Sequence, residues 1–293
     1  MKHRDKAIWT KLIELFLYSN LWIAGAAVAM TWQTRWILTG KLPVIELDGF
    51  IFCATLFLYA VHRIIALERL QLFASEGRFL TIAQRRKDIV LYALVAGAGS
   101  LFFFLQLSWS LQKMVVAPAL LSLLYVVPVF RGGRRLRDFH YLKIFLIAVV
   151  WTWVTVLLPA AEQHLLGQLA VLPLAGERML FIFAITIPFD IRDLHIDQHT
   201  QVQTLPSHLG IRRALGIALG LLAAATLFSW FLYRLDVYSN AMWTAWLLSA
   251  TVAGGLIAGT TAQRSDYYFT GWLDGTMILQ FALLYELEKY AAC

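Results

Sequence analysis

Long apolar runs separated by short polar connections dominate this chain. A transmembrane helix needs about 20 mostly apolar residues, because the hydrocarbon core of a bilayer is roughly 30 Å thick and a helix rises about 1.5 Å per residue. Runs of this length predict helical spans rather than the short alternating strands of an outer-membrane barrel. The runs are Leu12–Met30, Gly49–Leu67, Ile89–Leu107, Met114–Phe130, Ile144–Ala160, one that ends at Phe189, Ala214–Tyr233, Met242–Thr260 and Phe269–Leu287.

The sixth run is the least clear of these. Its uninterrupted apolar part covers only Met179–Phe189, because Glu177 and Arg178 precede it. A short or half-buried helix is therefore an alternative to a full span at this place. The longest polar connection, roughly 68–88, is too short to hold a core of its own. We expect one all-α domain over residues 1–293, a polytopic membrane bundle of about nine transmembrane helices.

Composition and charge agree with a membrane location. The 293-residue chain is 60% hydrophobic and 15% charged, whereas soluble domains contain about 25% charged residues. The segment Met1–Lys11 is basic and polar and the apolar run after it is full length, so we expect no cleavable signal peptide. The net charge of +7 suggests basic loops beside anionic membrane lipid rather than a nucleic-acid partner.

The distribution of lysine and arginine predicts the orientation of the bundle. With nine spans and the N-terminus inside, 18 of the 25 basic residues fall in inside segments and 6 in outside segments, with Arg63 within a span. Cytoplasmic loops carry this kind of excess. We therefore expect a cytoplasmic N-terminus in a bacterial inner membrane.

Three aspartates follow the sixth run directly. Asp190, Asp193 and Asp197 have a spacing that, on a helix, places the carboxylates on one face about 5–6 Å apart. Carboxylates this close repel one another unless a cation lies among them. Mg²⁺ is a natural candidate, because it takes oxygen ligands and commonly joins one or two carboxylates to substrate phosphates. The alternative is a solvated acidic helix end with Arg192 neutralising one aspartate, but ionisable residues at a membrane boundary favour a functional role.

The run Asp190-x-x-Asp193-x-x-x-Asp197, followed by Thr204-Leu205-Pro206 and Leu209-Gly210, resembles the second aspartate-rich motif of the UbiA-type intramembrane prenyltransferases. The resemblance implies nine helices around a cytoplasmic-side cavity. It also implies transfer of a polyprenyl group from its diphosphate to an aromatic or other lipophilic acceptor. The diphosphate would be held by Mg²⁺ on Asp190, Asp193 and Asp197 and by basic loop residues.

The first aspartate motif of that family is largely missing here. It reads Asn-Asp-x-x-Asp-x-x-x-Asp, and its Asn and first two Asp correspond to Ala60, Val61 and Ile64, so that only the acid Glu68 remains. A smaller departure is Gln201, where the second motif usually has glycine. Half of the metal ligands that the resemblance implies are therefore absent.

His62 and Arg63 lie in the same neighbourhood as the missing acids. Arg63 could bind a phosphate directly, because a guanidinium matches phosphate oxygens. The alternative is an ion pair between Arg63 and Asp190, Asp193 or Glu68 that holds an empty polar cavity together. His62 alone is more often a satisfied interior histidine than a catalytic base.

Other polar residues extend the candidate site. Arg137 and Lys143 follow Tyr125 in a basic loop that the resemblance assigns to diphosphate binding, and ordinary positive-inside charge is the alternative for this loop. Asp274, in the ninth run, should face the bundle interior, where it could contact an acceptor hydroxyl or pair with a buried cation. Asn20 lines a cavity or joins two helices by a hydrogen bond.

Three functions follow from these residues. The first is an active prenyltransferase with an altered magnesium–diphosphate site. The second is a UbiA-fold membrane protein that has lost the chemistry and binds lipid or a partner. The third is a transporter. The polar residues argue against it, because they cluster near one side of the membrane and mark no route across it.

Overall fold

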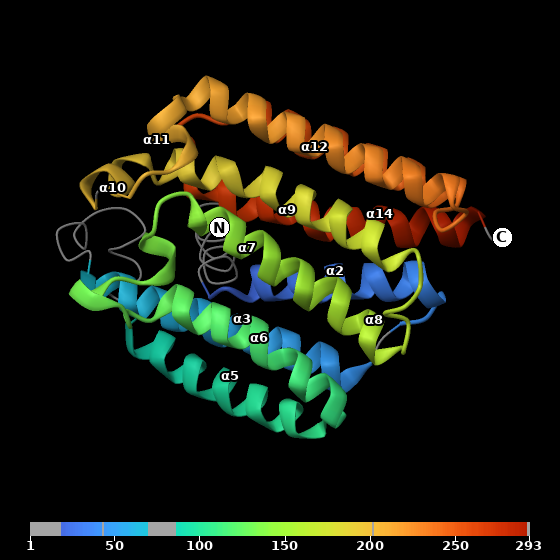
Figure 1. Cartoon of the computed structure of the whole chain (residues 1–293), viewed down its shortest axis with the longest axis horizontal. Helices are drawn as coiled ribbons and strands as arrows, with labels where there is room; N and C mark the ends of the chain where they lie inside the picture. The colour runs from blue at the N-terminus through green and yellow to red at the C-terminus, as the bar shows by residue number, and fades with distance from the viewer. Residues whose placement is uncertain (1–18, 43, 70–85, 201, 292–293) are drawn as a thin grey trace, which may run out of the picture.

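The computed structural model describes residues 19–42, 44–69, 86–200 and 202–291, with the backbone alone for 67–69 (Figure 1). Within these ranges the regular structure is helical, apart from an isolated bridge between Phe130 and Arg134. This confirms the predicted all-α class for the described part. The long helices are α2 (Leu21–Thr39), α3 (Ile45–Arg69), α5 (Arg86–Gln106), α6 (Trp109–Val126), α7 (Leu142–Thr152), α9 (Val171–Arg192), α12 (Ile211–Arg234), α13 (Asn240–Ala258) and α14 (Asp274–Ala291).

Short elements complete the long helices and cap one end of the bundle. Helix α7 continues through the π-helical turn η4 (Trp153–Leu157) into α8 (Leu158–Glu162), and a second π-helical turn, η5 (Tyr268–Leu273), leads into α14. The end of the bundle where α9 finishes carries η2 (Arg131–Gly133), η3 (Leu136–Asp138), α10 (Leu194–His199) and α11 (Leu205–Leu209).

Seven helical stretches in the described part are long and apolar enough to cross a membrane: Ile45–Ala66, Arg86–Gln106, Trp109–Val126, Leu142–Glu162, Val171–Arg192, Ile211–Arg234 and Asn240–Ala258. Large apolar side chains such as Leu94, Trp109 and Leu172 point outward and are exposed, as expected where lipid replaces water. The predicted polytopic helical membrane protein is confirmed at this level. The total of nine spans and the orientation stay predictions.

The first predicted span is placed differently along the sequence. Residues 12–18 of the predicted run lie outside the described residues, residues 21–30 lie in α2, and α2 runs on to Thr39. It thereby includes Gln33, Thr34 and Arg35, all buried. Hydropathy ends the span too early because polar side chains that face other helices resemble loop residues in a single sequence.

The sixth run forms a complete helix, so the alternative of a short helix there is wrong. Helix α9 begins at Val171 and contains both Glu177 and Arg178, which are 1% and 0% exposed. Arg178 donates hydrogen bonds to the carbonyl of Met30 at 3.0 Å and to Oγ1 of Thr155 at 3.1 Å. The Tyr238 hydroxyl donates to the carboxylate of Glu177. These partners make two charged residues acceptable inside the bundle.

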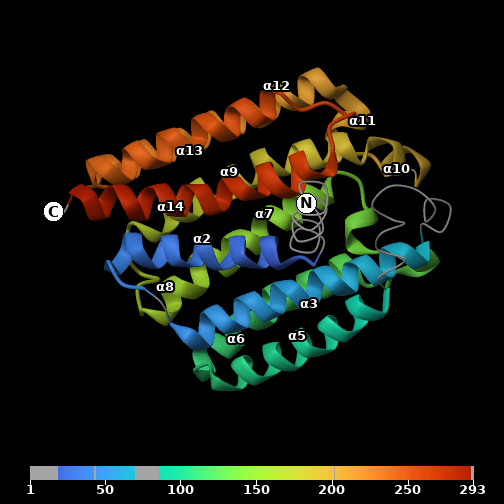
Figure 2. The ribbon, with the colours of Figure 1, turned by 180° about the vertical axis from the view of Figure 1, so that it is seen from behind.

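The helices form a closed ring when their packing is followed around the bundle. Helix α2 packs on α3, α3 on α6, α6 on α7, α7 on α9, α9 on α12, α12 on α13, α13 on α14 and α14 on α2 again. Helix α5 lies outside this ring against α3, at the edge of the molecule in both views (Figures 1 and 2). The ring thus encloses a space that residues far apart in the sequence can share.

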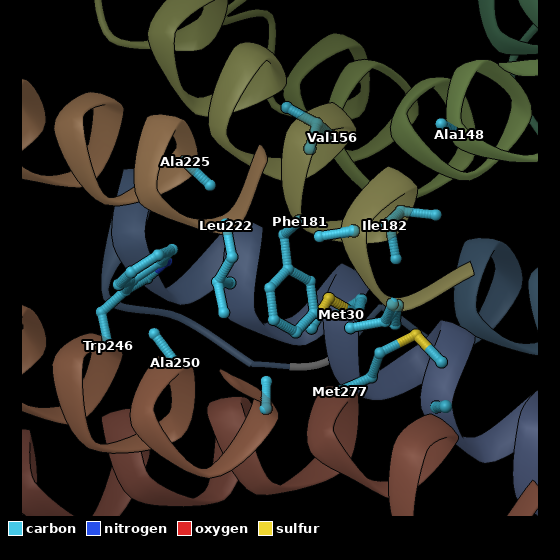
Figure 3. Packing of buried hydrophobic residues seen from close by; sticks show 14 of the residues in the cluster. Met30, Ala148, Val156, Phe181, Ile182, Leu222, Ala225, Trp246, Ala250 and Met277 are labelled. Carbon is cyan, nitrogen blue, oxygen red and sulfur yellow. The ribbon is translucent and has the colours of Figure 1, made fainter. Parts of the chain in front are cut away.

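The apolar core lies on the α9–α14 side of the ring. Phe181 and Ile182 of α9 meet Met30 of α2, Leu222 of α12 and Met277 of α14 (Figure 3). Small side chains on α12, such as Ala218 and Ala225, allow close approach of neighbouring helices. This core holds α9, the helix that carries the aspartates, in a fixed position.

A buried ion network closes the end of the bundle opposite to α10. Arg35, 1% exposed, pairs with Asp48 at 3.1 Å and with Glu162 at 2.8 Å. The indole of Trp32 donates to Asp48 at 2.7 Å, as does the backbone N–H of Val44 at 3.1 Å. The network therefore ties α2, α3 and α8 together with most of its polar atoms satisfied.

We predict that Arg35→Met lowers the melting temperature of the purified protein in detergent. Removing one partner of a buried ion pair leaves an uncompensated charge, at a cost of about 3–5 kcal/mol. Lys41→Met is the matched control, because Lys41 is an exposed cation at the same end. Equal melting temperatures for the two variants would show that the network adds no stability.

Candidate functional site

A cavity of about 1020 Å³ lies inside the ring. Its wall is formed by α2, α3, α6, α9, the α7–η4–α8 stretch and η5 with α14. Lys143 and Leu158, near the two ends of the same helical stretch, both line it. At about 1.5 Å per residue they are separated by roughly 22 Å along the helix, so the cavity extends through much of the depth of the bundle.

The cavity is polar at one end and apolar along the rest of its length. The polar end, which we call the polar mouth, lies where α3, α6 and α9 end and α7 begins. Apolar residues such as Phe50, Val115 and Ile185 line the remainder. The polar mouth contains His62, Arg63, Tyr125, Arg135, Arg137, Asp138, Lys143, Arg192, Asp193 and Asp197.

Lys143 supplies the cation that the three aspartates require. Its Nζ lies 2.7 Å from Oδ1 of Asp190, 3.6 Å from Oδ2 of Asp197 and 4.0 Å from Oδ2 of Asp193. None of these ion pairs gives the ammonium a hydrogen bond of regular geometry. Lys143 is therefore buried, charged and lining the cavity with hydrogen-bonding capacity left for a ligand.

The aspartates do not share one continuous helix, as the spacing alone predicts. Helix α9 ends at Arg192, and Asp193 is the residue between it and α10. The backbone N–H of Asp197 still donates to the carbonyl of Asp193 at 2.9 Å, so the chain bends without moving the carboxylates far apart. Asp190 in α9, Asp193 at the junction and Asp197 in α10 thus converge on Lys143.

The three aspartates have different surroundings. Asp193 and Asp197 line the cavity, whereas Asp190 is 1% exposed and lies behind Lys143, outside the lining. Burial raises the pKa of the Asp197 carboxyl to about 6. The negative charges of Asp193 and Asp190 also raise this pKa, whereas the ammonium of Lys143 lowers it. Asp190 thus contacts a lysine rather than the cavity, which differs from its predicted role as a metal ligand.

Arg137 joins the helix of the missing motif to the basic loop. It belongs to η3 and forms a short hydrogen bond with Nε2 of His62 on α3. Its guanidinium also lies over the ring of Tyr125, 5.1 Å from the centroid. Accepting a hydrogen bond from Arg137 through Nε2 requires the neutral form of the His62 imidazole. Both partners of Arg137, His62 and Tyr125, are then uncharged.

Two other arginines of the polar mouth are neutralised by aspartates. Arg135 pairs with Asp138 at 2.8 Å, and although burial opposes it, hydrogen bonds from Arg135 lower the pKa of Asp138. Arg192 pairs with Asp193 at 2.9 Å and approaches Asp266 at 3.7 Å. The guanidinium of Arg192 also stacks on two rings, those of Phe189 and Phe269.

Polar groups also reach the cavity beyond the mouth. Asp274 lines it directly after the η5 turn, and π-helical turns of this kind often occur at functional sites. Within the described residues no hydrogen bond or ion pair engages the Asp274 carboxylate, and its main electrostatic partner is Arg192. Asn20 lines the cavity and donates to the hydroxyl of Tyr92 on α5 at 3.3 Å, so it does both things that the sequence allows.

The sequence-predicted residues mostly meet in this one cavity. Arg63, His62, Tyr125, Arg137, Lys143, Arg192, Asp193 and Asp197 share the polar mouth, and Asp274 and Asn20 lie further along. The side chain of Glu68 is outside the described part of the chain. Sequence reasoning missed Asp138 and Asp266, since single acids in loops carry no pattern that separates them from solvated residues.

The donor set fits one magnesium ion better than two. Asp193 and Asp197 offer carboxylate oxygens to the cavity, which suits Mg²⁺ because it commonly uses one or two carboxylates together with substrate oxygens. On the facing helix α3, the lining residues near the mouth are Tyr59, His62, Arg63 and Ala66, which offer no carboxylate. Val61 and Ile64, the positions predicted from the motif alignment, do not line the cavity. Among the described residues no group of three or more acid, histidine or cysteine side chains is arranged to hold a metal.

Comparison with solved structures finds chains of the same fold at low sequence identity. A UbiA homologue from Archaeoglobus fulgidus bound to DMAPP and Mg²⁺ aligns with a TM-score of 0.63 at 13% identity, covering 93% of this chain and 99% of that one. The chain has the UbiA prenyltransferase fold. A UbiA homologue from Aeropyrum pernix K1 (TM-score 0.59, 14% identity, 96% and 98% coverage) and a digeranylgeranylglyceryl phosphate synthase (TM-score 0.59, 16% identity, 96% and 99% coverage) share it.

At these identities the likeness to solved structures establishes the UbiA fold and leaves the chemistry open. No family model and no curated protein matches the sequence. The same Archaeoglobus protein is also known bound to GPP and Mg²⁺. The resemblance inferred from the aspartate motif is therefore confirmed as a matter of fold.

We predict that Lys143→Met destabilises the protein at neutral pH, because three aspartates lose the ammonium that lies among them. Lowering the pH should restore part of the melting temperature, since protonation removes the repulsion between the carboxyls. Melting curves in detergent at pH 5 and pH 7.5 measure both effects. Lys87→Met, which removes an exposed cation, is the control. A Lys143→Met protein as stable as this control would contradict the role of Lys143 as counter-charge.

Asp197 should make stability depend on pH in a definite direction. An unfolded aspartate has a pKa of about 3.9, and the folded pKa of Asp197 is raised to about 6 by burial. The folded state therefore binds the proton more tightly, so the stability from protonated Asp197 is full below about pH 4 and lost as the pH rises through about 6. Without divalent ions, we expect the melting temperature to fall between pH 5 and pH 7.5, and less so in Asp197→Asn. Parallel pH profiles would refute this assignment.

Proposed function

We propose that this protein is an intramembrane prenyltransferase that moves a polyprenyl group from its diphosphate to a lipophilic acceptor. One observation carries the proposal: a single cavity combines a polar mouth rich in cations and carboxylates with a long apolar remainder. A prenyl diphosphate has the same two parts, an anionic head and a hydrocarbon tail. Neighbours of the same fold bound to DMAPP or GPP with Mg²⁺ support the choice of ligand.

The polar mouth would hold the diphosphate by charge. Lys143 and Arg137 line it, and Arg63 and Arg192 add two guanidinium groups. Asp193 and Asp197 would hold Mg²⁺, and Asp190 would keep Lys143 in place from behind. Bound there, the ion would supply positive charge to phosphate oxygens.

The reaction that we infer breaks the allylic C–O bond and leaves the electron pair on the diphosphate oxygen. The acceptor then forms a bond to the terminal allylic carbon and releases a proton. Lys143 and the arginines lower the barrier by stabilising negative charge as it develops on the leaving group. The apolar walls keep water away from the allylic cation, which favours transfer over hydrolysis.

Asp274 is our candidate for contact with the acceptor. It lines the cavity beyond the polar mouth, and within the described residues no ion pair occupies its carboxylate. It could therefore accept a hydrogen bond or the released proton from an acceptor hydroxyl. Asn20 lines the same cavity and offers a second polar contact.

We infer one membrane domain with a cytoplasmic polar mouth, in a bacterial inner membrane. The loops beside the mouth and the first turn of α12 carry Arg131, Arg134, Arg212, Arg213 and Arg264, whereas the opposite end has fewer basic residues. A cytoplasmic excess of lysine and arginine is the expected pattern. With α2 and the η5–α14 stretch added to the seven apolar helices, the bundle would have nine spans.

The two other functions remain as outcomes of a test. Loss of the first aspartate motif favours a protein that binds lipid without turning it over. Transport is disfavoured, because the charged residues of the cavity, apart from Asp274, gather at one end and mark no route through its apolar length.

The decisive experiment measures pyrophosphate release. Purified protein is incubated with geranyl, farnesyl and longer prenyl diphosphates, with Mg²⁺ or with EDTA, alone and with a membrane lipid extract as the source of acceptor. We expect release with Mg²⁺, and a drop of at least a hundredfold in Asp193→Ala, which removes a cavity-facing carboxylate. Asp236→Asn, an exposed aspartate at the opposite end of the bundle, is the control. Binding without release at any chain length would favour the lipid-binding function.

A further inference from the structure

We propose that this site uses a single magnesium ion and that the guanidinium of Arg137, held by His62 and Tyr125, contacts the diphosphate where a second metal would otherwise lie. The proposal rests on the proposed function, because it names how that same site would bind a diphosphate. Four observations carry it: the lack of carboxylates among the described α3 residues that line the cavity, the partners of each cation, the position of Arg137 and its support by neutral groups.

The described α3 residues that line the cavity include no carboxylate, and the Asp138 carboxylate of η3 is paired with Arg135. Asp193 and Asp197 come from the α9–α10 side and offer oxygen ligands for one ion. On the α3 side, the cavity is lined near the mouth by Tyr59, His62, Arg63 and Ala66, none of which is an acid. Within the described side chains, a second divalent ion would therefore have no carboxylate to hold it on that side.

The cations of the polar mouth differ in what already neutralises them. Lys143 pairs with Asp190 at 2.7 Å, Arg135 with Asp138 at 2.8 Å and Arg192 with Asp193 at 2.9 Å. Arg137 has no described carboxylate within ion-pair distance, and its close partners are His62 and the ring of Tyr125. Its charge is therefore the one among these four that an anionic ligand can neutralise without breaking an existing pair.

Arg137 lies at the α3 side of the polar mouth, where the lining residues carry no acid. The η3 turn carries it across the mouth to His62, which lines the cavity from α3. A planar guanidinium offers several N–H donors to phosphate oxygens, so it can take over charge neutralisation on this side. Mg²⁺ on Asp193 and Asp197 and Arg137 on the opposite side would then hold the diphosphate between them.

His62 and Tyr125 are positioning residues in this arrangement. The imidazole accepts a hydrogen bond from Arg137 through Nε2, and the phenol ring lies under the guanidinium at 5.1 Å. Both contacts orient the arginine without neutralising it, which a carboxylate partner would do. To orient Arg137 without neutralising it, position 62 requires an uncharged hydrogen-bond acceptor.

The test uses full-length protein in detergent, with Mn²⁺ in place of Mg²⁺ and inorganic pyrophosphate as the probe. Equilibrium dialysis with both solutes quantified gives the number of each bound per chain. We expect one Mn²⁺ and one pyrophosphate, and little pyrophosphate bound in EDTA. Two Mn²⁺ per pyrophosphate, or tight binding in EDTA, would overturn the single-ion site and leave the proposed function standing. No pyrophosphate binding under any condition would remove both.

Variants then separate Arg137 from its supports. Arg137→Met should weaken pyrophosphate binding about 10- to 100-fold, the effect of losing hydrogen bonds to a charged group, while Mn²⁺ and pyrophosphate still bind in equal numbers at saturation. His62→Leu should weaken it less, and His62→Gln, which keeps an uncharged acceptor, should recover most of the loss. Arg131→Met, an exposed arginine of the same loop that does not line the cavity, is the control. Unaltered affinity in a folded Arg137→Met protein would refute the proposal.

Discussion

The pairing of Lys143 with three aspartates is the interaction on which the rest of the site depends. Three carboxylates at the membrane boundary would be strongly destabilising without a cation, because their repulsion is little screened away from water. The ammonium at 2.7 Å from Asp190 and within 4.0 Å of the other two makes the cluster possible. It also fixes which carboxylates remain for a ligand, since Asp190 is covered and Asp193 and Asp197 face the cavity.

The same rule governs the other charged residues inside the bundle. Arg35 is held by Asp48 and Glu162, and Arg178 by backbone and hydroxyl oxygens. These groups hold helices together at positions away from the polar mouth, where ligand binding has no access to them. The charged residues inside this bundle thus fall into two groups. Those whose polar atoms are satisfied by other residues hold helices together, and those that face the cavity keep hydrogen-bonding capacity for a ligand.

The loss of one aspartate motif changes the electrostatics of the site without emptying it. The α3 side of the mouth presents His62, Arg63 and, through the loop, Arg137, and its described lining residues on α3 include no carboxylate. A site that binds an anion through metal ions on both sides and a site that binds it through one metal and one guanidinium place similar positive charge around the phosphates.

The sequence by itself determined the all-α membrane class, the UbiA resemblance and most of the candidate site. The length of each apolar run matches the bilayer thickness that a helix must span, so it can be read from the sequence. The spacing of Asp190, Asp193 and Asp197 and the residues after them form a local pattern, which the sequence also shows directly. Only the tertiary structure decided that Lys143 lies among the aspartates, that Asp190 is covered and that Arg137 contacts His62. Those pairings join residues 47 to 75 positions apart, and no local pattern specifies which side chains the ring of helices brings together. For the same reason α2 extends to Thr39 and α9 begins at Val171: charged residues that other helices neutralise look like span ends until the neighbours are known.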